Sequence, residues 1–242
     1  MNMIKLICLV LLILTMPMTS DAAGEKEESK SNASASSNLN LRPSYVPPLR
    51  GAPAGRVGGG TRGITENQTC TIQVMAPDHA GYTTQDQPCL YWYVSGGLNF
   101  PIEMTVTRKD AVQPLVEKQL PGPVEDGLHT FCLADHDVRL SPDVSYKWFV
   151  TLIPDTENRS KDILAGGIIE KIKVSKSLDE KLEAADGSTK VRAYAEEGLW
   201  YDSFDSAMKT LDKTPDDQTA LMQRNSLLEQ VGLKEISEQM KK

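Results

Sequence analysis

Basic residues and histidine are scarce in this chain of 242 residues. Lysine and arginine number 26 against 33 acidic residues, so the formal net charge is −7. Nucleic acid and anionic lipid both attract proteins with an excess of positive charge, so neither is expected as a partner. Proteins and neutral ligands remain as the expected partners.

Catalytic motifs are missing as well. The sequence has no Gly-x-Ser-x-Gly elbow, and Cys132 follows His129 by three residues, a spacing that places the two side chains on opposite faces of a strand. The glycines at 58–60 are not followed by Lys-Ser or Lys-Thr, so they do not form a phosphate-binding loop. We therefore predict no catalytic residue and no cofactor.

The histidines provide one cluster of metal-ligand types. Asp135, His136 and Asp137 are consecutive, His129 precedes them in the same region, and His79 is remote in sequence. A transition-metal site needs three or four converging ligands. Because the cluster follows a predicted strand, a solvated turn is the favoured interpretation, and no metal site is predicted.

The N-terminus has the parts of a secretory signal peptide. Lys5 precedes an apolar run over residues 6–16, and the small residues Ser20 and Ala22 fit a cleavage site. We predict a signal peptide over 1–22 and a mature chain that begins near Ala23. The run is too short to span a bilayer comfortably, so no stable membrane insertion is expected after cleavage. The expected location is the periplasm or the cell surface of a bacterium.

Residues 23–67 are rich first in serine and then in proline, glycine and arginine. Such a composition buries little apolar surface and predicts a disordered linker. A second interpretation remains open, because four arginines recur between the prolines and glycines of this segment. They could form a docking strip that becomes ordered only on binding: Arg42, Arg50, Arg56 and Arg62.

Short apolar or alternating runs separated by turn residues fill residues 68–175. Seven of them predict strands, at 69–75, 89–94, 101–107, 115–120, 129–133, 145–153 and 165–174. This pattern predicts an antiparallel β-sandwich of the immunoglobulin or fibronectin-III type. A Leu-x-Pro turn followed by Tyr146 resembles the tyrosine corner of those folds.

Alternation within these strands also assigns side chains to faces. Trp92 and Trp148 lie at strand centres and are expected in the core. Tyr91 and Tyr93 lie on the face opposite Trp92, where an exposed pair could bind sugar or peptide. Burial of this pair by the C-terminal helices explains the pattern equally well.

The cysteines of the mature chain are Cys70, Cys89 and Cys132. An oxidising compartment favours disulfide formation. If the strands that hold Cys89 and Cys132 pair in antiparallel fashion, the two side chains come opposite each other on the same face. We therefore predict a Cys89–Cys132 disulfide with Cys70 unpaired.

Residues 176–242 are predicted to be helical, with a first helix from Ser177 as the N-cap to Gly187 as the stop. Small and aromatic residues then follow at the spacing of one tetratricopeptide-like helical hairpin: Ala193, Gly198, Trp200, Phe204, Ala207, Leu211 and Pro215. A single such unit cannot bury its own apolar face. We expect Trp200 and Tyr201 to attach this hairpin to the sandwich.

The loop at 154–162 allows three interpretations. Asp155, Asn158 and Asp162 could wrap calcium, which prefers several oxygen ligands from one loop, but two basic residues interrupt the acidic run. A tight structural loop, in which Arg159 pairs with a carboxylate, is the favoured interpretation. An interaction surface that includes Asn158, Arg159, Ser160 and Asp162 is the other alternative.

Several of these segments together resemble a bacterial family called domain of unknown function 928. They are residues 81–95, 100–106, 127–133, 146–152, 154–162, 166–172 and 198–208, and the resemblance covers 68–233. It implies an exported protein with no assigned activity. It also implies a place in envelope assembly or sensing, because relatives are often encoded near exported adhesin-like and sensory membrane proteins.

The sequence thus predicts a non-enzymatic interaction module of the bacterial envelope, whose partner is an envelope or exported protein. The candidate interaction residues are Asn158, Arg159, Ser160, Asp162, Tyr91, Tyr93, Trp200 and Tyr201. One alternative is an envelope hydrolase that acts on glycan or peptide through Asp155, Asp162 and Asp202. This alternative predicts a pocket that gathers two of these carboxylates with a raised pKa. The other alternative is a carbohydrate-binding module with Tyr91 and Tyr93 exposed on one flat face.

Overall fold

The computed structural model of the chain describes residues 41–48, 55–58, 62–65, 68–97 and 99–240, with backbone alone over 62–70. The predicted signal peptide, Arg50 and the side chains of Arg62 and Cys70 lie outside what is described. Within these ranges, no helix combines the length and the apolar character that a membrane span requires.

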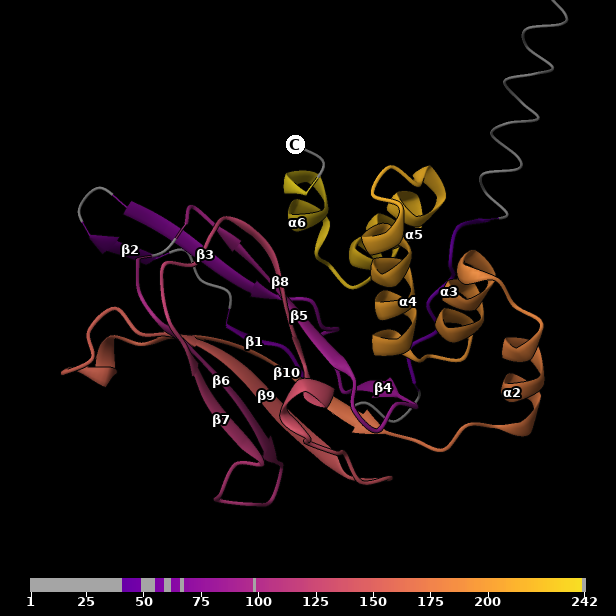
Figure 1. Ribbon diagram of the computed structural model, residues 1–242, viewed down its shortest axis with the longest axis horizontal. Helices are drawn as coiled ribbons and strands as arrows, with labels where there is room; N and C mark the ends of the chain where they lie inside the picture. The colour runs from indigo at the N-terminus through magenta and orange to yellow at the C-terminus, as the bar shows by residue number, and fades with distance from the viewer. Residues whose placement is uncertain (1–40, 49–54, 59–61, 66–67, 98, 241–242) are drawn as a thin grey trace, which may run out of the picture. The chain divides into compact units, whose positions relative to one another are not determined.

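Two sheets form the strand-rich part of the protein (Figure 1). The first has the order β1-β10-β9-β6-β7, with β4 also paired to β10, and the second has the order β2-β3-β5-β8. The first sheet comprises β1 Val57–Gly58, β4 Gly81–Thr83, β6 Ile102–Arg108, β7 Val116–Leu120, β9 Ser145–Leu152 and β10 Ile163–Lys171. The second comprises β2 Arg62–Thr65, β3 Gln68–Val74, β5 Cys89–Ser95 and β8 Gly127–Cys132.

All strand pairs are antiparallel except that of β4 with β10. The seven strands predicted from alternation are all present, as β3, β5, β6, β7, β8, β9 and β10. The sequence did not predict β1, β2 and β4, and β1 and β2 lie within residues 23–67, where a disordered linker was expected. These three strands are two to four residues long, which is too short for an alternating pattern to be recognised.

Apolar side chains from both sheets meet in one core. In β6, Ile102, Met104 and Val106 are buried while the residues between them are partly exposed, as period-two alternation requires. The opposing residues of β5 include Leu90 and Trp92, and all of these side chains belong to one hydrophobic cluster. Trp92 and Trp148 are buried as predicted.

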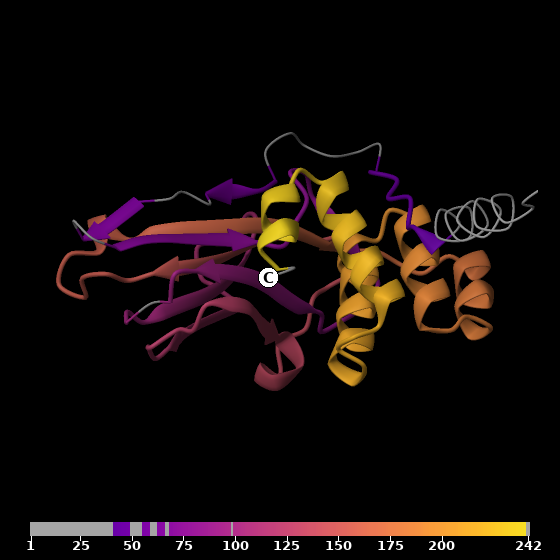
Figure 2. The ribbon, with the colours of Figure 1, turned by 90° about the horizontal axis from the view of Figure 1, so that it is seen from above.

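Five helices follow the sheets and gather at one end of them in both views (Figures 1 and 2). They are α2 Lys176–Glu183, α3 Gly187–Glu196, α4 Trp200–Lys213, α5 Gln218–Gln230 and α6 Lys234–Gln239. The predicted limits of the first helix are wrong. Ser175 caps α2 by accepting a hydrogen bond from the Leu178 amide at 3.2 Å, and Gly187 begins α3.

Helix α4 lies at the centre of the helical part and is buried on almost every side. Its apolar residues, among them Trp200 and Phe204, belong to the same cluster as the core of the sheets. The helices and the sheets therefore share one core. The α3–α4 hairpin packs on α5, and α4 also packs on β4 and β5, so the strands supply part of the core that stacked repeats would otherwise supply.

Residues 41–48, which we name the N-terminal strap, lie against α3 and α5. The Gln223 and Gln230 side-chain amides donate hydrogen bonds to the carbonyl oxygens of Leu41 and Pro43 at 2.9 and 3.0 Å. The Tyr45 amide donates to Gln230 Oε1 at 2.9 Å.

The strap continues along α3, where the amide of Val46 donates to the carbonyl of Ala195 at 3.0 Å. Gly198 lies beside it with φ +76°, and a Cβ atom at this position would come within 2.7 Å of the Val46 carbonyl oxygen. The structure therefore differs from the expected linker over 41–48. Side chains from distant helices satisfy the backbone, and Tyr45 supplies a buried anchor that is only 7% exposed.

Two local predictions about the sheets have the expected geometry. Cys89 and Cys132 are directly opposite in the β5–β8 ladder and form a disulfide, with their Cα atoms 3.9 Å apart. The Tyr146 hydroxyl accepts a hydrogen bond from the Ser141 amide at 3.0 Å, which is the contact expected of a tyrosine corner.

The disulfide joins cysteines 43 residues apart, and we expect its reduction to lower the free energy of unfolding by about 3–4 kcal/mol. The measurement is urea unfolding with and without a reductant. A Cys89→Ala/Cys132→Ala double variant serves as the control, because it should unfold at the same urea concentration under both conditions. Equal stability of the oxidised and reduced wild type would contradict the prediction.

Candidate functional site

The loop at 154–162 is held together by its own side chains. Asp155 Oδ1 accepts hydrogen bonds from the amides of Glu157 and Asn158 at 3.0 and 3.2 Å, and Oδ2 accepts one from Lys161 Nζ at 2.8 Å. These bonds hold the pKa of Asp155 below its usual value, and the bond from Lys161 has the largest effect. Ser160 donates to the Asn158 side-chain oxygen at 2.6 Å. A tight structural loop therefore accounts for these residues.

Arg159 links this loop to the first sheet. Its Nε donates to Asp162 at 2.6 Å and its Nη2 donates to Glu103 of β6 at 2.9 Å. The two carboxylates raise the pKa of Arg159. Asp155 is thus paired with Lys161, and Asp162 Oδ2 with Arg159, so basic residues of the loop occupy carboxylate oxygens that a calcium site would need.

Tyr91 and Tyr93 are buried, with 7% and 8% of their surface exposed. The Tyr91 hydroxyl donates to Asp205 Oδ1 of α4 at 2.9 Å, and its ring packs edge-on against Phe204. Burial, and next the negative charge of Asp205, raises the pKa of Tyr91. Of the two interpretations of this pair, exposure is therefore wrong, and for Tyr91 burial by the C-terminal helices is correct, because α4 covers it. Alternation identified the face of the strand but not what lies on it.

Trp200 and Tyr201 attach α4 to the sheets, as expected. The Tyr201 hydroxyl accepts a hydrogen bond from Trp148 Nε1 at 2.9 Å and donates one to the Ile168 carbonyl at 3.0 Å. Trp200 is fully buried, and its Nε1 donates to the Met75 carbonyl at 3.3 Å. These three residues of the strand region, Trp148, Ile168 and Met75, thus receive α4 in one defined orientation.

Asp202 and Asp205 complete this junction on the next positions of α4. Asp202 accepts hydrogen bonds from the amide and the hydroxyl of Thr84, both at 2.9 Å. Asp205 accepts bonds from Tyr91, from Gln85 Nε2 at 3.2 Å and from Lys209 Nζ at 2.7 Å. Burial raises the pKa of Asp202 to about 6, although the bonds from Thr84 oppose this shift.

The raised pKa of Asp202 does not define a hydrolase site. Asp202 has no exposed surface, and its partners come from residues 83–85. Asp155 and Asp162 have other partners, within their own loop and on β6, so the three carboxylates share no partner among the described residues. A buried carboxylate fully bonded to a loop is explained by the packing of α4.

The three histidines lie in separate surroundings. His79 is hydrogen-bonded to the Tyr45 hydroxyl at 2.8 Å and so helps to hold the strap. His129 stacks on Trp92, and His136 stacks on Phe131 with ring centroids 4.1 Å apart. Among the residues that the structure describes, no three histidine, cysteine or acidic side chains group together as metal ligands.

Two arginines of the expected docking strip, Arg42 and Arg56, have described side chains, and these differ in their contacts. Arg56 Nη1 donates to the carbonyls of Ala76 and Val231, both at 3.0 Å, and so ties the segment that follows the strap to the β3–β4 loop and to the end of α5. Arg42 is exposed and lines a groove on α5.

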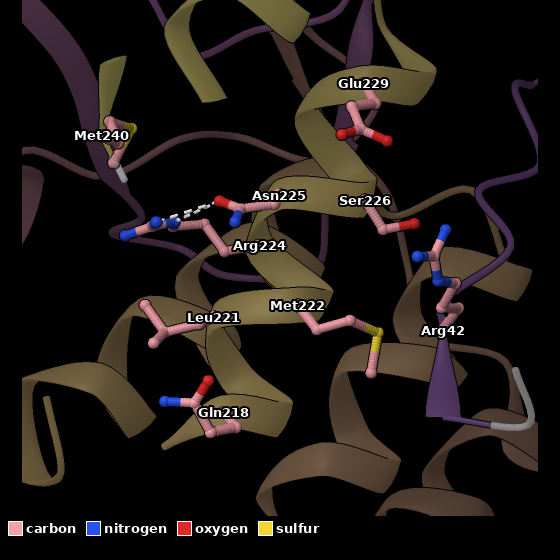
Figure 3. A pocket seen from close by; sticks show the side chains of 9 residues that line it. All are labelled: Arg42, Gln218, Leu221, Met222, Arg224, Asn225, Ser226, Glu229 and Met240. Carbon is pink, nitrogen blue, oxygen red and sulfur yellow. Dashed lines mark hydrogen bonds between the residues drawn. The ribbon is translucent and has the colours of Figure 1, made fainter. Parts of the chain in front are cut away.

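This open groove has a volume of about 500 Å³ and extends around the surface of α5 (Figure 3). Residues of α5, one residue of the strap and the end of α6 line it: Arg42, Gln218, Leu221, Met222, Arg224, Asn225, Ser226, Glu229 and Met240. Figure 3 shows Arg42 and Arg224 on opposite sides of α5. We name it the α5 groove; it combines charged, amide and apolar side chains.

Arg224 is the functional candidate that the sequence analysis missed. The inner face of α5 is formed by Ala220, Gln223, Arg224, Leu227 and Leu228, at the i, i+3, i+4, i+7 and i+8 positions of an amphipathic helix. A charged residue within this periodic apolar set was the available signal. Arg224 as a whole residue is 7% exposed, and burial lowers its pKa.

Comparison with known proteins identifies a family. The sequence profile described as Domain of Unknown Function (DUF928) matches residues 57–240, which is most of the chain, and the chain belongs to this family. The resemblance based on its strand and helix segments is thereby confirmed. No curated protein matches the chain.

Replacing Tyr201 by Phe should lower the free energy of unfolding by about 2–4 kcal/mol, because Trp148 Nε1 and the Ile168 carbonyl both lose a buried partner. Chemical denaturation checks this value. Tyr194→Phe is the matched control, since no hydrogen bond of the Tyr194 hydroxyl occurs among the described residues, and its change should stay below about 0.5 kcal/mol. Equal effects of the two variants would contradict a special role for Tyr201.

Asp202 should make stability depend on pH. Its pKa is about 6 in the folded protein and about 3.9 in an unfolded chain, so unfolding releases a proton between these values. The contribution of protonated Asp202 is complete below about pH 4 and is lost as the pH rises through about 6. Between pH 4 and pH 7, we expect the free energy of unfolding of the wild type to fall relative to Asp202→Asn by up to about 3 kcal/mol.

Urea unfolding of both proteins across this pH range measures the difference. The exposed Asp216→Asn serves as the control and should follow the wild type. Parallel pH profiles for wild type and Asp202→Asn would show that burial does not shift this carboxyl group.

Proposed function

We propose that this member of the DUF928 family is an exported, non-enzymatic interaction module of the bacterial envelope. In this proposal the α5 groove binds a segment of another exported or envelope protein. The sheets and the remaining helices act as the rigid support that holds α5. Export rests on the predicted signal peptide over 1–22.

The observation that carries the proposal is the composition of the α5 groove. It offers apolar contact at Leu221, Met222 and Met240, and polar contact at Asn225 and Arg224. The groove has a volume of about 500 Å³, within the range of ligand-binding sites, and its lining is mostly polar, with three apolar side chains among six polar or charged ones. A helix that presents such a face commonly takes part in protein recognition.

We further propose that the two sheets form a sandwich of the immunoglobulin or fibronectin-III type. The tyrosine corner at Tyr146, the cross-strand Cys89–Cys132 disulfide and the core shared between the sheets support this proposal. Such folds serve many functions, so the function is argued from the groove and not from the sheets.

The rival functions have less support. A hydrolase needs carboxylates open to substrate, whereas Asp202 is enclosed and Asp155 and Asp162 are ion-paired or hydrogen-bonded within their loop. A carbohydrate-binding face needs exposed aromatic rings, whereas Tyr91 and Tyr93 are buried. Neither argument concerns the α5 groove, which remains the strongest candidate.

Site-specific photo-crosslinking in the native envelope tests the proposal. A photoreactive phenylalanine analogue replaces Met222 in the groove or, as a control, the exposed Lys118 of β7. We expect a discrete crosslinked partner from position 222, at about tenfold or higher yield than from position 118. The partner is bound next to position 222 in the groove, whereas it meets position 118 only in weak, non-specific contacts. A Ser226→Trp change should fill the groove and remove the crosslink.

Equal crosslinking from positions 222 and 118 would contradict the proposal. So would a crosslink that persists at full yield after Ser226→Trp, because the partner would then bind elsewhere. The folding of each variant is checked by the urea midpoint, which a change at the half-buried Ser226 should leave within about 1 kcal/mol of the wild type.

A further inference from the structure

Among the residues that the structure describes, the guanidinium of Arg224 has one hydrogen-bonding partner. Its Nε and Nη2 both donate to the side-chain oxygen of Asn225, at 3.1 and 2.9 Å. Arginine has five N–H donors, so this arrangement uses two of them and leaves the end of the guanidinium formed by Nη1 and Nη2 unsaturated. That end is the edge that can grip a carboxylate with two parallel hydrogen bonds.

No acidic partner neutralises Arg224 within the part of the chain that the structure describes. The side chain is nevertheless 7% exposed. A charge held away from water without a counter-charge is destabilising, and a ligand that supplies the counter-charge recovers part of that energy. The other buried charged side chains, Asp202 and Asp205, have two or more partners each, so Arg224 is the exception among them.

The groove is also positive on a protein that is negative as a whole. Arg42 and Arg224 line it against a single carboxylate, that of Glu229, whereas the complete chain has a net charge of −7. Arg42, like Arg224, takes part in no ion pair among the described residues. Figure 3 places Arg224 on the side of α5 where Met240 lies, and Arg42 on the other side beside Ser226.

Building on the proposed role of the groove, we propose that its ligand is an acidic, apolar segment of a partner protein. A carboxylate of this segment binds the free end of the Arg224 guanidinium, next to the side-chain amide of Asn225. Apolar residues beside the carboxylate pack on Leu221 and Met240, which lie on the same side of α5 as Arg224, while Met222 lies on the side of Arg42 (Figure 3). Arg42 attracts a second acidic group across α5. The charge of the groove thus selects the class of segment, and its apolar residues supply contact area.

Two short peptides that differ in one group test this proposal on the mature protein. The probes are acetyl-Leu-Glu-Leu-Leu-amide and acetyl-Leu-Gln-Leu-Leu-amide, titrated while the ¹⁵N resonance of Arg224 Nε is followed by NMR. This N–H is observable because it is hydrogen-bonded to Asn225 and shielded from solvent. We expect a saturable shift with the glutamate peptide and a dissociation constant at least about tenfold higher with the glutamine peptide.

Variants assign the effect to Arg224. Arg224→Gln should bind both peptides equally, and Arg224→Lys should retain only part of the preference, because lysine keeps the charge but lacks the planar fork. Arg192→Gln is the matched control, since Arg192 lies on α3 in an ion pair with Glu196. Arg224 lies on the inner face of α5, so its variants could fail to fold. The comparison of the two peptides on the wild-type protein tests carboxylate recognition without the Arg224 variants.

Three outcomes would overturn the proposal. Equal binding of the two peptides would show that the groove does not recognise a carboxylate. A crosslink at Met222 would in that case still support the groove as a binding site. Loss of both peptide binding and crosslinking would remove the proposed function as well. An equal shift with inorganic phosphate alone would indicate a general anion site.

The chain itself contains a competing occupant, because Glu25, Glu27 and Glu28 precede the strap in sequence. Replacing all three by Gln should leave the Arg224 Nε resonance unchanged in the absence of peptide. A change comparable to that caused by the glutamate peptide would show that the protein's own N-terminal segment fills the groove, and would overturn the assignment to a partner.

Discussion

Helix α4 brings polar groups into an interface that excludes water, and each of them must find a partner there. An unsatisfied buried donor or acceptor costs about 1–3 kcal/mol, which is comparable to burying a large apolar side chain. The Tyr201 hydroxyl meets Trp148 and Ile168, and Asp202 meets Thr84. A helix with these requirements has one position in which all of them are met. The placement of the whole helical part depends on this junction.

The remaining elements follow from that placement. Once α4 is fixed, α3 and α5 flank it, and the strap fits along both through Gln223 and Gln230. Arg56 then joins the carbonyls of Ala76 and Val231, so the chain between strap and sheet also depends on the helices. The motif residues at 200–202 are explained by their contacts in this architecture. Asn158, Arg159 and Ser160 are explained by the hydrogen bonds that they make from their loop.

Buried charged residues differ in whether an opposite charge or several hydrogen bonds compensate them. Asp202 carries a shifted pKa but is fully bonded, so its titration affects stability and not recognition. Arg224 is also buried, at 7% exposed against 0% for Asp202, yet its hydrogen-bonding partner among the described residues is a neutral amide on the same helix. A protein under selection for stability alone would place an apolar residue at this position of α5. The charge therefore has its most direct explanation in a ligand that arrives from outside.

The sequence by itself determined the seven longer strands, the Cys89–Cys132 pairing and the tyrosine corner at Tyr146, because each depends on alternation or on contacts set by strand pairing. Only the tertiary structure decided that Tyr91 and Tyr93 are buried, that residues 41–48 are ordered, and that Arg224 lines a groove. Period-two alternation states which side chains share a face but not which element covers that face. The strap is held by glutamines more than 180 residues away in sequence, and no local pattern records such a partner.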